Sequence, residues 1–175
     1  RVLVRIIAPV LSFTAEEIWQ SMPEAAKDAD SIHLSKWYEE NSNYINDELD
    51  QKWDKIIKLR KEVNKVLEKA RQGENRIIGN SLDAEVSLFI GNDEYKSLLA
   101  DKELLEMIFI ISKLNIVETK DDSFTESEEL KDISIKVAHA TGEKCERCWK
   151  YSEELGTHEE HSTICPRCTG VLVNN

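Results

Sequence analysis

The sequence predicts a multidomain α+β protein with a partial α-helical bundle over residues 1–80, a small α/β module over residues 82–140 and a four-cysteine ribbon over residues 141–175. Three observations predict this fold class. A long amphipathic stretch is typical of a bundle helix, a short alternating apolar segment is typical of a strand, and two Cys-x-x-Cys pairs stand in the last quarter of the chain. Gly73 and Gly79 mark the end of the helical part.

The first fifty residues predict two short helices and a connection. Apolar residues at helical spacing over 1–12 indicate the buried side of a helix that Pro9 ends. Thr14-Ala-Glu-Glu17 has the form of a capping box, so we expect a second helix to begin there and to stop near Pro23. The residues expected on the buried side of the first helix are Val2, Leu3, Ile6, Ile7 and Val10. The apolar residues expected to hold the following connection on the helices are Ile32, Leu34 and Trp37.

The longest predicted helix runs from about residue 47 to residue 72. At 100° per residue, its apolar side chains fall on one broad face and four lysines share the opposite face, which by itself indicates solubility. Arg60 and Arg71 fall on or beside the apolar side, where a guanidinium group needs a carboxylate or a phosphate as its partner. The apolar face consists of Leu49, Trp53, Ile56, Leu59, Val63, Leu67 and Ala70. The lysine face consists of Lys58, Lys61, Lys65 and Lys69.

A small α/β module is predicted after this helix. Residues 84–90 alternate in part and indicate a strand, residues 95–111 fit one broken helix or two short ones, and residues 114–117 and 133–138 indicate two further strands. We therefore expect a three-stranded sheet with one face covered by helix. The acidic stretch 121–129 is expected to be a mobile loop.

The ribbon contains all four cysteines of the chain. Cys145 and Cys148 form one Cys-x-x-Cys pair, and Cys165 and Cys168 form another after a sixteen-residue gap. This arrangement is typical of two tight turns that present four thiolates to one tetrahedral zinc ion. Two disulfides would use the same residues, but the rest of the chain does not have the composition of a disulfide scaffold. A closed set of four sulfurs leaves no position for substrate, so we expect one structural Zn²⁺ per chain.

Trp149 directly follows the second cysteine, and its role has two interpretations. Its ring could pack over the zinc turn, or it could stack on an unpaired base, which is worth about 1–3 kcal/mol. Arg147 and Lys150 lie beside it, but acidic residues outnumber basic ones from Cys145 to the end of the chain, so the ribbon is not a basic patch.

Charge is unevenly distributed along these 175 residues. The formal net charge of −11 argues against a nucleic-acid partner, because affinity for phosphate comes largely from Lys and Arg. Residues 1–50 carry a net charge of −6 and residues 93–133 carry −7, whereas residues 51–76 carry +5. One positive segment in an acidic chain is what a localised phosphate contact requires.

The sequence also sets expectations for location and assembly. No apolar run approaches the roughly 18–20 residues that cross a bilayer, so we expect no membrane partner. Reduced cysteines and the lack of a targeting peptide indicate the cytoplasm. The chain opens at Arg1 inside an apolar helical pattern, so we expect a fragment of a longer protein, and we expect a monomer.

Three segments together resemble one protein family. Residues 7–19, IAPVLSFTAEEIW, look like the signature of the anticodon-binding bundle in class I aminoacyl-tRNA synthetases for isoleucine, valine and leucine, and the SFT within it resembles the isoleucyl form. Parts of residues 53–84 look like the last bundle helix and exit of the isoleucyl enzymes. The segment from Lys144 to Trp149, with Cys165-Pro-Arg-Cys168, is similar to the C-terminal zinc ribbon of bacterial isoleucyl-tRNA synthetases.

This resemblance implies a function for the chain. The complete enzymes attach isoleucine to tRNA(Ile) using ATP and Mg²⁺ in a catalytic domain, and this sequence contains neither a His-x-Gly-His nor a Lys-Met-Ser-Lys-Ser string, so we expect no catalytic residue in it. The chain is expected to bind the anticodon stem-loop of tRNA(Ile), beside the remaining domains of the same enzyme. The candidate RNA contacts are Arg60, Lys61, Lys65, Arg71, Arg147, Trp149 and Lys150.

Two alternatives belong to other classes. A ribbon with this gap also resembles the zinc finger of bacterial DNA glycosylases, but such an enzyme needs its own helical DNA-binding motif before the ribbon. The other alternative is a zinc-stabilised scaffold module without RNA contact, for which tRNA binding would be absent or insensitive to salt.

Overall fold

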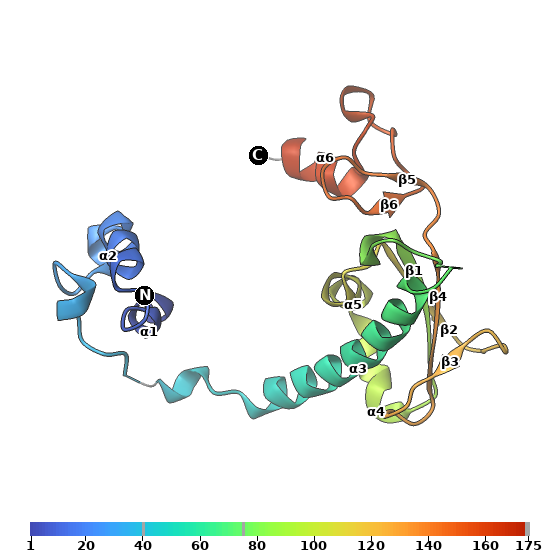
Figure 1. Cartoon of the computed structure of the whole chain (residues 1–175), viewed down its shortest axis with the longest axis horizontal. Helices are drawn as coiled ribbons and strands as arrows, with labels where there is room; N and C mark the ends of the chain where they lie inside the picture. Colours follow the sequence, from blue (N-terminus) through green and yellow to red (C-terminus); the bar gives the residue numbers. More distant parts are fainter. Residues whose placement is uncertain (40, 75, 174–175) are drawn as a thin grey trace. The chain divides into compact units, whose positions relative to one another are not determined.

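The computed structural model describes residues 1–39, 41–74 and 76–173, which form two compact units, Arg1–Asn46 and Asp47–Asn175 (Figure 1). The first unit contains α1 (Val2–Ile7) and α2 (Ser12–Ser21). Short 3₁₀ turns at Glu24–Ala26, Ile32–Leu34 and Ser42–Tyr44 follow them. The buried residues of this unit are Val4, Ala8, Ala15, Trp19 and Ile32.

Details of the first unit differ from the sequence predictions. Thr14 lies inside α2, whose N-cap is Leu11, so the predicted capping box is wrong. The predicted buried side of α1 is also largely wrong, because the helix turns Val4 and Arg5 inward. Burial of Arg5 is possible because its guanidinium donates to Asp28 Oδ1 at 2.6 Å and lies over the Trp19 ring. Leu3, Ile6, Val10, Leu34 and Trp37, which were expected to be buried, are exposed.

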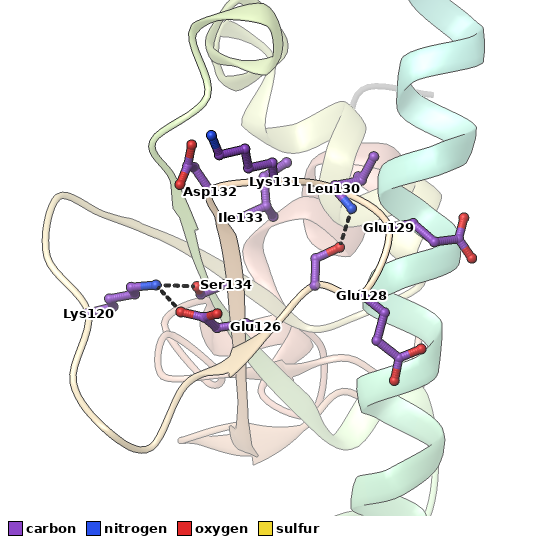
Figure 2. Close-up of a pocket in the computed structure, with 10 residues that line it drawn as sticks. Lys120, Glu126, Glu128, Glu129, Leu130, Lys131, Asp132, Ile133 and Ser134 are labelled. Atoms are coloured by element: carbon purple, nitrogen blue, oxygen red, sulfur yellow. Dashed lines mark hydrogen bonds and ion pairs between the residues drawn. The ribbon is translucent and has the colours of Figure 1, made fainter.

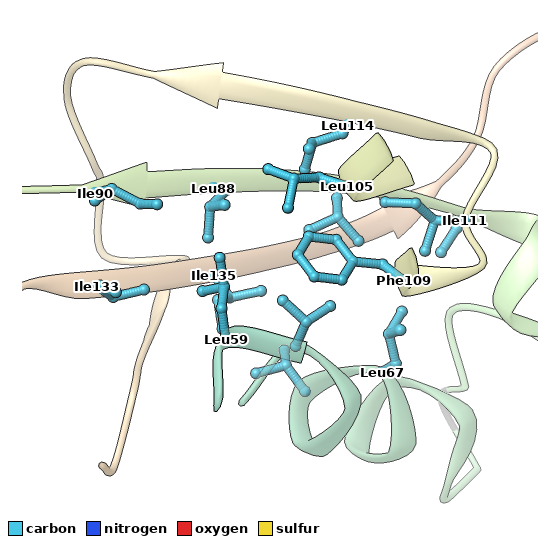
Figure 3. Close-up of a cluster of buried hydrophobic side chains, with 14 of the residues drawn as sticks. Leu59, Leu67, Leu88, Ile90, Leu105, Phe109, Ile111, Leu114, Ile133 and Ile135 are labelled. Carbon is cyan, nitrogen blue, oxygen red and sulfur yellow. The ribbon is translucent and has the colours of Figure 1, made fainter. Parts of the chain in front are cut away.

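The long predicted helix is α3 (Asp47–Arg71), and its C-terminal part packs on the sheet of the second unit. The acidic first turn and the basic last turn of α3 complement the helix dipole. Figure 3 shows Leu59 and Leu67 of α3 facing Leu88, Phe109 and Ile135 in one continuous core. Leu49 and Trp53, at the N-terminal end of the predicted apolar face, are exposed.

Four strands form the sheet in the order β2-β1-β4-β3, where three strands were expected. They are β1 (Ala84–Ile90), β2 (Lys113–Val117), β3 (Thr125–Glu126) and β4 (Ile133–His139). β2 runs parallel to β1, while β4 is antiparallel to both β1 and β3. Every second residue of β1 is buried, as a strand with one covered face requires.

Helices cover the inner face of this sheet. The segment predicted as a broken helix contains α4 (Asp93–Lys96), a 3₁₀ turn at Ser97–Ala100 and α5 (Lys102–Phe109). Figure 1 shows α5 and α3 on the same side of the strands. The stretch 121–129 was expected to be a mobile loop, but it supplies β3 and is fastened to β4, where Ser127 N donates to Ile133 O at 2.9 Å.

The boundary between the two packed units lies earlier in the sequence than the domain boundary predicted from the sequence. α3 shares its core with the sheet, so the two units separate between residues 46 and 47, whereas the helical domain was placed at residues 1–80. The predicted boundary followed the helical pattern, and periodicity cannot tell which neighbour a helix packs against. Among the helices that the structure describes, none combines the length and apolarity needed to span a bilayer.

The ribbon contains a two-stranded sheet and a terminal helix. Its strands are β5 (Glu143–Lys144) and β6 (Tyr151–Ser152), and its helix is α6 (Pro166–Val173), preceded by a 3₁₀ turn at Glu159–His161. Gly142 at the entrance has a φ angle of 90°, and a Cβ atom there would lie 2.4 Å from the Ser152 carbonyl carbon. Only glycine therefore allows the chain to enter the ribbon along this path.

Candidate metal centre and nucleic-acid interface

The structure brings the sulfur atoms of all four cysteines together. They lie within 4.8 Å of one another, and Cys148 Sγ is 3.7 Å from Cys165 Sγ. A tetrahedral zinc ion with Zn–S bonds of about 2.3 Å places its sulfurs about 3.8 Å apart, so the spacing fits this metal. No disulfide joins the cysteines, and three of them are buried. The four thiolates thus fit a closed, structural zinc site.

Backbone groups shape this sulfur cluster. The Trp149 amide donates to Cys145 O at 2.9 Å and closes the first turn, and the Cys165 amide donates to Cys145 Sγ at 3.3 Å. Burial raises the pKa of the Cys145 thiol, but hydrogen bonds from the amides of Cys148, Cys165 and Arg147 outweigh burial and bring its pKa to about 6. The surrounding amides therefore favour the thiolate form of Cys145, whereas burial raises the pKa of the Cys148 thiol.

Neither histidine of the ribbon joins the cysteines. The His158 and His161 rings stack on each other with centroids 5.4 Å apart. Within the described part of the chain, the group of metal-binding atoms contains the four cysteines and no histidine.

Arg147, predicted as an RNA contact, is directed toward the metal site. Its Nη1 atom lies 3.6 Å from Cys168 Sγ, at hydrogen-bonding distance for sulfur. Such a contact offsets part of the negative charge of a four-thiolate centre. Lys150 is half-buried, and its carbonyl oxygen accepts a hydrogen bond of 2.9 Å from the Cys145 amide.

Trp149 is largely exposed directly after the first pair of cysteines. Its side chain is 60% exposed, and its φ angle is 65°, in the left-handed region that bulky residues rarely adopt. A residue held in this region costs about 1–3 kcal/mol, and such positions concentrate at functional sites. The turn thus places a large aromatic ring in solvent at a position where glycine would be the less strained residue.

The ribbon is fastened to the α/β module by a residue that sequence reasoning missed. Ser112 Oγ accepts a hydrogen bond of 2.7 Å from the Tyr151 amide of β6 and donates to Leu82 O. The Tyr151 ring meets His139 edge-on, with centroids 4.9 Å apart. Nothing in the local sequence around Ser112 indicates this long-range contact. The ribbon therefore rests on the same module whose core contains α3.

The candidates on α3 fall into two groups. Arg60 and Lys61 are exposed, and neither forms an ion pair with any residue that the structure describes. Arg71 is half-buried, and its Nη1 atom lies 2.7 Å from Glu68 Oε1. A guanidinium group at this position was expected to need a carboxylate or a phosphate, and here the partner is a carboxylate. Lys65 Nζ lies 2.7 Å from Glu62 Oε1. This carboxylate neutralises the positive charge of Lys65, which was predicted to contact RNA.

Comparison with known proteins identifies the family of the N-terminal half of the chain. Residues 1–88, half of the sequence, match the family described as the anticodon-binding domain of tRNA ligase. The chain belongs to this family. A second family model, a zinc finger found in FPG and IleRS, matches residues 142–169, which include all four cysteines.

Similar proteins align along nearly the whole chain. The isoleucine–tRNA ligase of Desulforamulus reducens is 43% identical over 172 residues, which cover 97% of this chain and 18% of that protein. The isoleucine–tRNA ligase of Caldicellulosiruptor bescii is 40% identical over 171 residues, covering 97% and 17%. The chain thus spans less than a fifth of the length of these relatives. Its helical match and these relatives do not favour the DNA glycosylase alternative.

Proposed function

We propose that this chain binds the anticodon stem-loop of an isoleucine tRNA as one part of an isoleucine–tRNA ligase. The observation that carries the proposal is the match of residues 1–88 to anticodon-binding domains, in a chain whose relatives are isoleucine–tRNA ligases along 97% of its length. In the complete enzyme, ATP and Mg²⁺ would serve isoleucine activation elsewhere, and this chain would contribute tRNA recognition. We also propose a monomeric enzyme in the cytoplasm, a compartment in which free cysteines persist.

One structural zinc ion, held by Cys145, Cys148, Cys165 and Cys168, is part of this proposal. When bound, the metal would hold together a segment that is too short for a hydrophobic core of its own. The protein residues then act on the RNA. The first turn holds the Trp149 ring in solvent, where an unpaired base of the anticodon loop can stack on it.

Phosphate contact is assigned to the exposed side of α3. Arg60 and Lys61 are exposed, and neither forms an ion pair with a carboxylate of the described residues. Both are therefore suited to contact a backbone phosphate. Arg71, Arg147 and Lys150 are at least partly engaged within the protein, so we assign them smaller contributions. Replacing Arg60 with Ala should make the salt dependence of tRNA binding shallower.

The proposal is tested by binding of the zinc-loaded chain to an isoleucine tRNA and to the same tRNA with its anticodon loop exchanged, at one salt concentration. We expect a clear preference for the native loop. Trp149→Ala should weaken binding by about 1–3 kcal/mol with the zinc content unchanged. Equal affinity for the two tRNAs, together with an unchanged affinity of the variant, would contradict anticodon reading by this chain.

A further inference from the structure

The segment between β3 and β4 lies against α3 and meets its lysine face. Lys65 Nζ is 2.8 Å from Glu129 Oε1 and 3.5 Å from Glu128 Oε2, and Lys69 Nζ is 3.5 Å from Glu128 Oε1. Figure 2 shows Glu128 and Glu129 extending from this segment beside the helix. Carboxylates from a distant part of the sequence thus engage two of the four lysines of the lysine face.

A buried carboxylate of α3 anchors the segment. Glu62 is 2% exposed, and its Oε2 atom accepts hydrogen bonds from Ser127 Oγ at 2.5 Å and from the Glu128 and Glu129 amides at 2.8 and 3.3 Å. Its Oε1 atom lies 2.7 Å from Lys65 Nζ. Removing one partner from a buried charge is strongly destabilising, so Glu62 holds both the segment and Lys65 in place.

The two ends of the lysine face therefore differ in charge. Around Lys65 and Lys69, two lysines meet three carboxylates, which leaves one net negative charge. Toward the N-terminus of α3, Lys58 and Lys61 are exposed and pair with no carboxylate of the described chain. Only this second end presents uncompensated positive charge to solvent.

We propose that Glu128 and Glu129 form an acidic clamp that withdraws Lys65 and Lys69 from RNA and confines phosphate contact on α3 to Lys58, Arg60 and Lys61. The RNA partner rests on the proposed function, whereas the clamp rests on the contacts above. One helical turn separates Lys58 from Lys61, about 5 Å along the axis. A phosphate backbone that moved from there toward the C-terminus of α3 would meet the clamp carboxylates, so the clamp determines where along α3 the RNA can lie.

The first test removes the clamp charges in the full chain with Glu128→Gln and Glu129→Gln together. Both side chains are largely exposed and the backbone amides that bind Glu62 remain, so the fold should persist. Because Lys69 becomes free while Lys65 keeps its pair with Glu62, the slope of log K against log salt for an RNA hairpin should steepen by about 0.7–0.9, with a gain in affinity of about twofold at moderate salt. The matched control is Glu118→Gln with Asp122→Asn, which changes net charge equally at residues that engage no lysine of α3.

The second test compares two lysines. Lys61→Gln should make the slope shallower by about 0.7–0.9, whereas Lys69→Gln, which leaves the pair of Lys65 with the buried Glu62 intact, should leave it unchanged. Equal losses for the two variants would overturn the clamp, because Lys69 would then contact RNA as Lys61 does.

Inorganic polyphosphate serves as a probe that does not depend on tRNA recognition. The clamp variant should bind polyphosphate more tightly than its control variant does. If the two bind equally, the inference is wrong. If the clamp variant gains affinity but the parent chain shows no preference for the native anticodon loop, the clamp stands and the proposed function fails.

Discussion

Trp149 has a positive φ angle of 65° and an exposed indole ring, and these two features make opposite demands on the residue. The left-handed backbone favours glycine, since a side chain there costs about 1–2 kcal/mol. An exposed aromatic ring makes few contacts that could offset this cost. The residue is thus poorly suited to stability alone, which supports a role in contact with a ligand.

Trp149→Gly separates these demands. Relief of backbone strain is partly offset by the greater freedom of glycine in the unfolded chain, about 0.5–1 kcal/mol, so ribbon stability should be equal or slightly higher. Affinity for the anticodon loop should fall as it does for Trp149→Ala. Thermal unfolding and zinc affinity measure the stability of the ribbon, and tRNA binding measures the affinity for the anticodon loop. A large loss of stability in the glycine variant would show that the ring packs on the protein after all.

Glu62 gives the second unit a specific sensitivity to acid. Burial raises the pKa of this carboxyl group, but hydrogen bonds from Lys65 and Ser127 outweigh burial and lower it to about 2, from a usual value of 4.5. Because the folded pKa is lower than the unfolded one, the stability that Glu62 contributes is fully present above pH 4.5 and is lost as the pH falls toward 2.

Urea unfolding between pH 2 and pH 6 measures this contribution. Glu62→Gln should lower stability at neutral pH and flatten the acid loss relative to the unmodified chain. Glu68→Gln is the control, since that carboxyl group lies on the same helix but is exposed. Parallel acid profiles for the parent chain and Glu62→Gln would contradict the assignment.

At the scale of elements, Ser112 joins the ribbon to the sheet through the Tyr151 amide and the Leu82 carbonyl. Ser112→Ala leaves both backbone groups without this partner, and an unsatisfied buried group costs about 1–3 kcal/mol. We expect faster hydrogen exchange at the Tyr151 amide and weaker tRNA binding, with unchanged zinc content. Ser87→Ala in β1 is the control. If the hydrogen-exchange rate of the Tyr151 amide does not change, other contacts hold the ribbon on the sheet.

The elements differ in how far the sequence could predict them. The helix predicted over residues 47–72 ends one residue earlier, because its apolar period is long and regular. β1 has the predicted bounds, because its apolar residues are followed directly by the turn residues Gly91, Asn92 and Asp93. β3 was missed because two residues in an acidic segment carry no periodicity. The buried side of α1 was misjudged because Arg5 depends on Asp28, which lies in a different part of the sequence.

The candidate site shows the same division. Local spacing was enough to indicate that four sulfurs would meet, because each Cys-x-x-Cys pair makes its own turn. It could not indicate that Glu62 would be buried or that Lys65 would be paired, because both depend on the segment between β3 and β4 folding back onto α3. The spacing likewise could not indicate that Trp149 would be largely exposed, because exposure depends on the surrounding fold.

At the scale of the molecule, the sulfur cluster and the core of the α/β module are separate sources of stability. The cluster of buried apolar residues that joins α3 to the sheet contains no residue of the ribbon. Cys148→Ser should therefore release zinc and unfold the ribbon while the α3 and sheet core stays folded. Metal analysis and hydrogen exchange along the chain would show this, and retention of one equivalent of zinc by the variant would contradict a site of four thiolates.

The position of β1 between β2 and β4 has a consequence for synthesis of the chain. Its antiparallel ladder pairs Ala84 with His139, so a ribosome must release the chain through β4 before β1 gains that neighbour. Until then the apolar side of α3 has only part of its cover, and pairings between distant segments form slowly. A nascent chain halted inside β4 would expose this surface and be prone to aggregate, which makes it a natural client for chaperones.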